Sequence, residues 1–393
     1  MSSSRNRVIY AGNTVLISNY PAWDNQTGDY NLKLLNRIQS SAISIDTPLT
    51  RPKQIGSSQF AFEKYINYPT VKVDLEYYLT DNSNELLLGF NASGSEGILK
   101  NLATSEKDRN LFFVFSEEEN VDVNSLTNYT GLDVFGVGNA FITDYSISAS
   151  VNSIPSAKVS FDALNIVYQK YTGFSVGEGI SGPIVTNGTP IPAINLTNGI
   201  KATGSYLLAP NNFDTSKYLT YQSVKPKALS PAEIILNLEQ PVLGGVRYSG
   251  SVSANITDLQ INIPIERKDL VGFGSNYPYD KKLIFPILGS VSFNGIFDNQ
   301  VTGELNNLFN ENNGYDMSFL LKDCDFATKL KFEIFDARID SQSFSMSIGE
   351  NMAFSSTFNF KIFEQDGFRI SGASRLKKSL SVEEGNDISV DEE

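Results

Sequence analysis

Two stretches of the chain, 145–163 and 343–362, limit its fold most, because both alternate apolar residues with polar ones. In the first, Tyr145, Ile147 and Ala149 alternate with three serines. Alternation with a period of two places the two kinds of side chain on opposite faces of a β-strand. A short break rich in turn residues follows, and then a second alternating run. This arrangement predicts a β-hairpin with one buried face.

The second stretch repeats the first under a constant shift, which matches Ile142 with Ile339, Phe161 with Phe358, and serines with serines. The shared parity is informative, because a slip of one position would reverse every face. Five elements of the same kind also recur upstream in the same order under a larger shift, which matches Tyr68 with Phe285. In the first copy they are a strand at 38–45, a polar stretch at 47–56, a strand at 68–78, a helical patch at 96–102 and an apolar run at 111–115; in the second they are 256–263, 266–274, 285–293, 303–309 and 317–321.

We infer an internal duplication in which the segment 117–134 supplies most of the extra length of the first copy. The predicted fold is mainly β, with two tandem β-sandwich or barrel domains that each carry a short flanking helix. The predicted domains are 1–170 and 230–372. A linker rich in Gly, Pro and Asn joins them at 171–229, and 373–393 is expected to be a disordered acidic tail.

The composition removes much catalytic chemistry. The chain has no histidine and a single cysteine, Cys324. Catalytic triads, imidazole bases, histidine metal sites and internal disulfides are therefore excluded, whereas carboxylate and lysine chemistry remains open. Phenylalanine is abundant, with 26 residues, but strand alternation without interleaved Lys and Arg is typical of a sheet core and not of a nucleic-acid stacking platform.

Four motifs that could carry chemistry are better explained as structure. Asp24–Asp29 lacks the calcium-loop pattern, and Gly136–Gly138 lacks the third glycine of a dinucleotide fingerprint and precedes a strand. Glu117–Glu119 has no identified partner carboxylate at catalytic separation. Cys324 stands between two aspartates, which disfavour a thiolate. We therefore expect a protein that is not an enzyme and that holds no metal and no cofactor.

The net charge of -13 argues against a protein that clamps DNA or RNA by neutralising phosphates. It is compatible with a wall past which DNA moves, because an acidic surface repels a polyanion. The serines of Ser146–Ser150 and Ser343–Ser347 are candidates for such a wall; the alternative is that they face solvent or another subunit. No stretch approaches 18 apolar residues, so we expect a soluble protein without a membrane span.

Polar stretches at 47–58 and 265–275 lie between strands at corresponding positions of the two copies. One interpretation is a pair of surface hairpin loops. The other is a pair of arms that dock on the next subunit of an assembly. The candidate interface residues under the second interpretation are Pro48, Leu49, Arg51, Pro52, Lys53, Ile55, Glu266, Arg267, Lys268 and Asp269.

The first copy, at Ile38–Ser41, Tyr68–Val71 and Tyr77–Asp81, resembles the major tail protein of long-tailed bacteriophages. The likeness to this tail-tube family covers about 8–168 and 230–370. It implies β-sandwich or barrel domains with a flanking helix, six of which join their sheets into a ring. Rings stack into a tube through which DNA leaves the capsid. Two domains in one chain imply a trimer with pseudo-sixfold symmetry.

The resemblance also implies partners and location: further copies of the chain in stacked rings, other tail proteins such as the tape measure, baseplate or terminator proteins, and a possible sheath. DNA would be present only in transit, and the virion would assemble in the host cytoplasm. Two alternatives stay open. One is a baseplate hub or tube-end adaptor with two tube domains. The other is a non-viral β-sandwich adhesin or binding module, against which the single Trp23 counts, because it lies outside both repeats.

Overall fold

The computed structural model places most of both copies and parts of the segments between them. The residues that it describes are 14–18, 23–24, 29–30, 33–46, 49–53, 55–56, 64–65, 70–104, 108–116, 132–151, 153–170, 194–195, 199–200, 235–239, 255–271, 278–296, 314–322, 328–345 and 353–372.

β-Strands dominate the described residues. Their bounds are β1 (Thr14–Ser18), β2 (Trp23–Asp24), β3 (Asp29–Tyr30), β4 (Lys33–Leu35), β5 (Ile38–Asp46), β6 (Leu49–Thr50), β7 (Lys64–Tyr65), β8 (Thr70–Tyr78), β9 (Arg109–Ser116), β10 (Leu132–Ser150), β11 (Ser156–Ala163), β12 (Asn165–Lys170), β13 (Ile194–Asn195), β14 (Gly199–Ile200), β15 (Ile235–Glu239), β16 (Asn255–Pro264), β17 (Arg267–Val271), β18 (Pro278–Leu283), β19 (Ile287–Ile296), β20 (Tyr315–Lys322), β21 (Thr328–Ser345), β22 (Ala353–Ile362) and β23 (Phe368–Gly372). The helices are α1 (Ser83–Leu88) and α2 (Lys100–Thr104).

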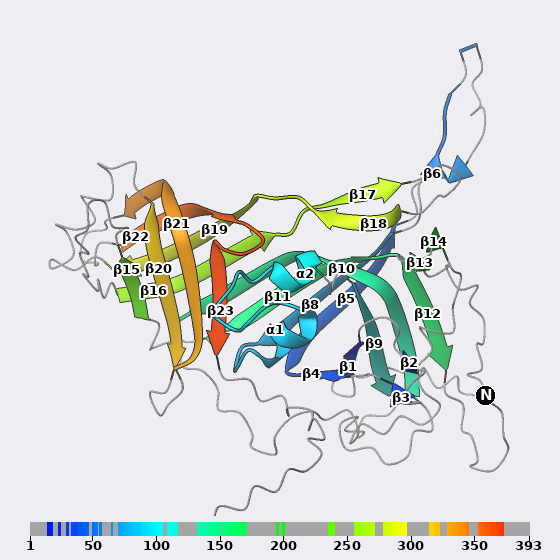
Figure 1. Cartoon of the computed structure of the whole chain (residues 1–393), viewed down its shortest axis with the longest axis horizontal. Coiled ribbons are helices and arrows are strands. Elements are labelled where there is room, and N and C mark those ends of the chain that lie inside the picture. The colour runs from blue at the N-terminus through cyan, green and yellow to red at the C-terminus, as the bar shows by residue number, and fades with distance from the viewer. Residues whose placement is uncertain are drawn as a thin grey trace, which may run out of the picture.

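The strands of the first copy form two layers that share the long strand β10 (Figure 1). The C-terminal half of β10 pairs with β11, and the layer continues through β8 to β5. Its N-terminal half pairs with β9 and β12, and β9 pairs with β1. The predicted hairpin is formed by β10 and β11, with Tyr145 opposite Val159.

The second copy repeats each of these pairings. β21 takes the place of β10 and pairs with β22, β20 and β23, while β22 pairs with β19, β19 with β16, and β20 with β15. Phe161 lies opposite Val73, and its predicted counterpart Phe358 lies opposite Val291. Val73 and Val291 are therefore counterparts too. The predicted match of Tyr68 with Phe285 would have placed Val73 with Ser290, one position away.

Both long strands bend between their layers at the same position. Asn139 has a φ of 51° and Asp336 a φ of 52°, in the left-handed region that Asn and Asp tolerate better than most residues. The backbone N–H of Asn139 donates to Asn110 Oδ1 at 3.2 Å, and that of Asp336 donates to Asp316 Oδ1 at 3.1 Å. The two corners therefore share one backbone strain and one side-chain support.

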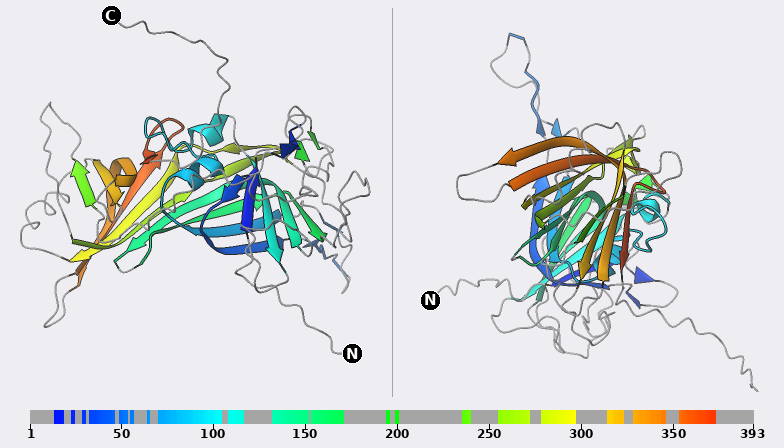
Figure 2. Two further views of the ribbon diagram at one scale, coloured as in Figure 1. Left: turned by 90° about the horizontal axis from the view of Figure 1, so that it is seen from below. Right: turned by 90° about the vertical axis from the view of Figure 1, so that its left-hand side faces the viewer.

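The two copies are joined by antiparallel pairing of β10 with β16, in which Ser146 lies opposite Asn262 and Ile147 opposite Ile261. One layer is therefore a continuous sheet in the order β5, β8, β11, β10, β16, β19, β22, β21. Figure 2 shows this sheet from two further directions. The connection turns the two predicted domains into neighbours within a single sheet.

Apolar side chains from alternate positions fill the space between the layers, and α1 and α2 lie over β8 and β11 (Figure 1). The predicted helical patch at 96–102 corresponds to α2, whereas α1 was not predicted. The helix expected at 303–309 lies outside the described residues. No helix in the described part of the chain has the length and apolar character needed to cross a membrane.

Candidate assembly interface

The continuous sheet has one apolar face and one polar face. On β10, Tyr145, Ile147 and Ala149 are buried in the core, and the serines between them lie on the opposite face, as predicted. The polar face carries transverse rows of hydroxyl and amide groups. One row is Tyr78, Ser156, Ser148, Gln260, Ser292, Thr357 and Ser341, and the next is Glu76, Lys158, Ser146, Asn262, Ser290, Asn359 and Arg338.

The charges on this face are few and slightly acidic in balance. Lys158 Nζ lies 4.0 Å from Asp74 Oδ1, and the Ser160 hydroxyl donates to the same carboxylate. Ser40 Oγ donates to Glu76 Oε2 at 3.3 Å. Strand alternation, with the β21 bulge left out, assigns more acidic than basic residues to the face: Asp46, Asp74, Glu76, Asp144, Asp162 and Asp258 against Lys72, Lys158, Arg338 and Lys361.

The two ends of this sheet, β5 and the C-terminal half of β21, each pair with one strand among the described residues. The edge strand β5 carries an exposed apolar side chain: Ile45 is 54% exposed. The match of Val73 with Val291 makes Ile263 its counterpart on β16, and Ile263 is fully buried where β16 pairs with β10. The difference is the one expected if β5 lacks a neighbour that β16 has.

Both polar stretches form hairpin arms of equal register. Leu49 pairs with Tyr65 in the first arm, β6–β7, and Arg267 pairs with Leu283 in the second, β17–β18. The shift that matches Val73 with Val291 also matches these two pairs, residue for residue. In Figure 1 the second arm lies along the upper edge of the sheet, whereas the first stands beyond it.

The candidate interface residues of the first arm are largely exposed. Ile55 projects fully, at 103% exposure. Arg51 and Lys53 are exposed, Pro52 is half-buried, Leu49 lies in β6, and Pro48 is outside the described residues.

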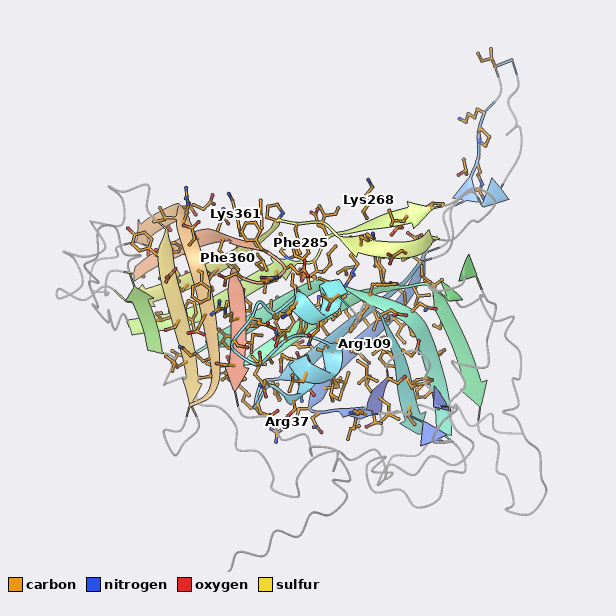
Figure 3. The ribbon with its side chains drawn as sticks, viewed as in Figure 1. Arg37, Arg109, Lys268, Phe285, Phe360 and Lys361 are labelled. Atoms are coloured by element: carbon orange, nitrogen blue, oxygen red, sulfur yellow. The ribbon has the colours of Figure 1, made fainter. Side chains whose placement is uncertain are left out.

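In the second arm, Glu266, Lys268 and Asp269 are exposed, and Lys268 projects from the upper edge (Figure 3). Arg267 differs from them, because it is largely buried against the first copy. Its Nε donates to the Ile142 carbonyl at 3.2 Å, and burial lowers the pKa of its guanidinium to about 10.

The root of the second arm is built around Phe141, which is fully buried on β10. The guanidinium carbon of Arg267 lies 5.3 Å from the centroid of the Phe141 ring, and Lys281 Nζ lies 5.7 Å from it. Lys281 also pairs with Asp269 Oδ1 at 3.5 Å. Ile265 N–H donates to the Thr143 carbonyl at 2.8 Å. Cation–π contacts and hydrogen bonds therefore hold this arm to the first copy.

A buried carboxyl on α1 connects the helix to the sheet. Glu85 Oε1 accepts hydrogen bonds from the Tyr77 hydroxyl at 2.8 Å and from the Tyr145 hydroxyl at 3.0 Å. Burial raises the pKa of Glu85 to about 7. Sequence analysis missed Glu85, Phe141 and Ile45; of these, Ile45 had a usable signal in its match to a buried position of the second copy.

The described residues include no group of three or more Cys, Asp or Glu side chains arranged to hold a metal ion. The motif Glu117–Glu119 and Cys324 lie outside the described residues. Gly136 and Gly138 lie within β10, in agreement with the strand predicted there. Asp24 and Asp29 belong to the short hairpin of β2 and β3.

No protein-family model and no curated protein matches the chain. Three solved structures are similar to parts of it. They are an anti-feeding prophage baseplate (9% identity, 35% of this chain and 92% of that chain, TM-score 0.27), the tail of an empty GTA particle (15%, 35% and 96%, 0.24) and the SPP1 tail tube (10%, 48% and 98%, 0.29). Likeness at these TM-scores does not establish a function.

Proposed function

We propose that the protein is a structural component of a phage tail whose copies close into rings and build the tail tube. The observation that supports this most is the junction of β10 with β16. Under the duplication, β21 is the counterpart of β10 and β5 is the counterpart of β16. An unpaired β21 edge on one copy and an unpaired β5 edge on the next are therefore suited to pair in the same way.

The internal junction defines the register of this contact. The pair Ser146 and Asn262 corresponds to Ser343 of one copy and Ser44 of the next. The contact would cover Ile45, as the internal junction covers Ile263. Burial of one isoleucine side chain contributes about 1.5 to 3 kcal/mol, so the edge gains stability from a partner.

Strand geometry favours three copies. The contact joins two different edges, and such head-to-tail contacts close into rings when the rotation permits. Three chains give 24 strands; at about 4.8 Å per strand and a tilt of about 40°, the backbone barrel is about 48 Å across. Two chains give about 32 Å, which leaves little room after side chains for a duplex about 20 Å wide.

The polar face of the sheet would line the channel. Its hydroxyl and amide rows offer water-like contacts, and its acids exceed its bases. Such a wall would let DNA pass without holding it, since each neutralised phosphate would slow transit. We therefore expect purified protein to show no affinity for duplex DNA at near-physiological salt. Tight, salt-sensitive binding would argue against a conduit.

Within this proposal, 1–170 and 230–372 are the two tube domains, 171–229 the linker and 373–393 an acidic tail. The arms would mediate contacts between stacked rings, and the chain would also meet other tail proteins in the virion.

The experiment is negative-stain imaging with sedimentation of the purified chain. Rings with three times the 43.3 kDa mass of one chain would support the proposal. A monomer at all concentrations and salt conditions would contradict it. Copy number in the virion separates a tube, with many rings, from a hub, with one.

A further inference from the structure

We propose that Arg338, on β21 of one copy, is the seat for the root of the first arm of the next copy, with Glu63 of that arm as its ionic partner. This inference rests on the proposed ring. It concerns a charged contact that lies outside the paired strands, and it follows from a comparison of the two arms within one chain.

The second arm shows what a seated arm needs. Its root lies on the bend of β10, where Phe141 is covered by Arg267 and Lys281. Two hydrogen bonds to the carbonyls of Ile142 and Thr143 fix its direction. The seat therefore consists of one ring and two carbonyl groups, and it belongs to the neighbouring copy of the duplicated unit.

The corresponding seat for the first arm lies on β21. The shift that matches Phe161 with Phe358 places Arg338 where β10 has Phe141, and Ile339 where it has Ile142. Phe141 is fully buried, whereas the Arg338 side chain is 63% exposed. Arg338 Nε lies 3.8 Å from Asp336 Oδ1, in an exposed ion pair of small energetic value. This seat is uncovered in the single chain.

The arm residues change together with the seat. Where the second arm has Arg267, the first arm has Leu49, in the same hairpin register. The sequence has Glu63 directly before β7, at the position that Lys281 holds in the second arm. An aromatic seat thus meets two cations, and a cationic seat meets one leucine and one carboxylate. Each seat is complementary to its own arm and would repel the other, which makes the order of contacts around the ring specific.

Charge reversal tests this pairing. Arg338→Glu and Glu63→Arg are each expected to raise the protein concentration at which rings form by at least about tenfold, because like charges then face each other. The double variant is expected to return to within about threefold of wild type. Lys361→Glu is the matched control, since it makes the same charge change at an exposed site on the neighbouring strand, and it should leave assembly unchanged. Circular dichroism of each variant confirms that the fold is retained.

The outcomes separate the two proposals. Rescue by the double variant supports the Arg338 seat. If wild type forms rings and Arg338→Glu forms them equally well, or if the double variant is not rescued, this inference is overturned while the ring stands. If wild type forms no rings under any condition, the ring proposal fails and the seat fails with it.

Discussion

At the scale of single residues, Glu85 gives the chain a pH-dependent stability. Folding raises the pKa of this carboxyl from 4.5 to about 7, mainly by burial. The folded protein therefore keeps a proton that the unfolded chain releases above pH 4.5. The resulting contribution, on the order of 3 kcal/mol, is complete below pH 4.5 and disappears as the pH rises through 7. Urea unfolding of wild type and Glu85→Gln across this range measures it.

We expect the free energy of unfolding of wild type, relative to Glu85→Gln, to fall between pH 5 and pH 8. The glutamine does not titrate, yet it keeps an oxygen that can accept from Tyr77 or Tyr145. Taking the difference removes the effect of the other carboxylates. A difference that stays constant over the range would show that Glu85 is ionised at the same pH in both states.

At the scale of elements, the bends of β10 and β21 depend on residues that tolerate the left-handed region. Asp336, with φ of 52°, has an exposed side chain, so its backbone contribution can be tested without disturbing the core. Asp336→Gly should leave the melting temperature nearly unchanged, whereas Asp336→Val should destabilise by about 1 to 2 kcal/mol. Equal effects of the two substitutions would show that the bend does not require this conformation.

The two arms should respond differently to change. Deleting 48–55 should leave circular dichroism and melting nearly unchanged, because the described residues there are exposed, and it should abolish long tubes. Arg267→Ala should instead destabilise the chain by about 2 to 3 kcal/mol, since it removes buried packing and a hydrogen bond. A deletion that unfolds the protein, or that still yields normal tubes, would refute the assignment of the first arm.

Much of the strand layer could be predicted, because alternation of apolar and polar residues directly encodes a half-buried strand. This applies to β10, β11 and β22. The helix α1 could not, since six residues are too few for a helical period to emerge. The contact of Glu85 with Tyr145 joins residues far apart in sequence, and single-sequence patterns contain no information on such pairs. The arms were located correctly, but nothing local distinguished the buried Arg267 from its exposed neighbours.

At the scale of the whole molecule, the order of elements was sufficient to infer the duplication. It was not sufficient to show that β10 pairs with β16, because the join between copies depends on edges and not on patterns within strands. That join supports the central claim, since it leaves two complementary edges open. The chain would complete around a threefold axis the sheet that it begins within itself.

Disulfide trapping of this contact tests the claim most directly. Ser343→Cys and Ser44→Cys are introduced with Cys324→Ser, and oxidised protein is run on a denaturing, non-reducing gel; antiparallel partners lie within disulfide range. Ser146→Cys with Asn262→Cys is the matched control, which should cross-link within one chain. The account predicts a ladder from the first pair that ends at three chains. A ladder that continues beyond three would contradict the trimer, and monomer alone would contradict ring closure through these edges.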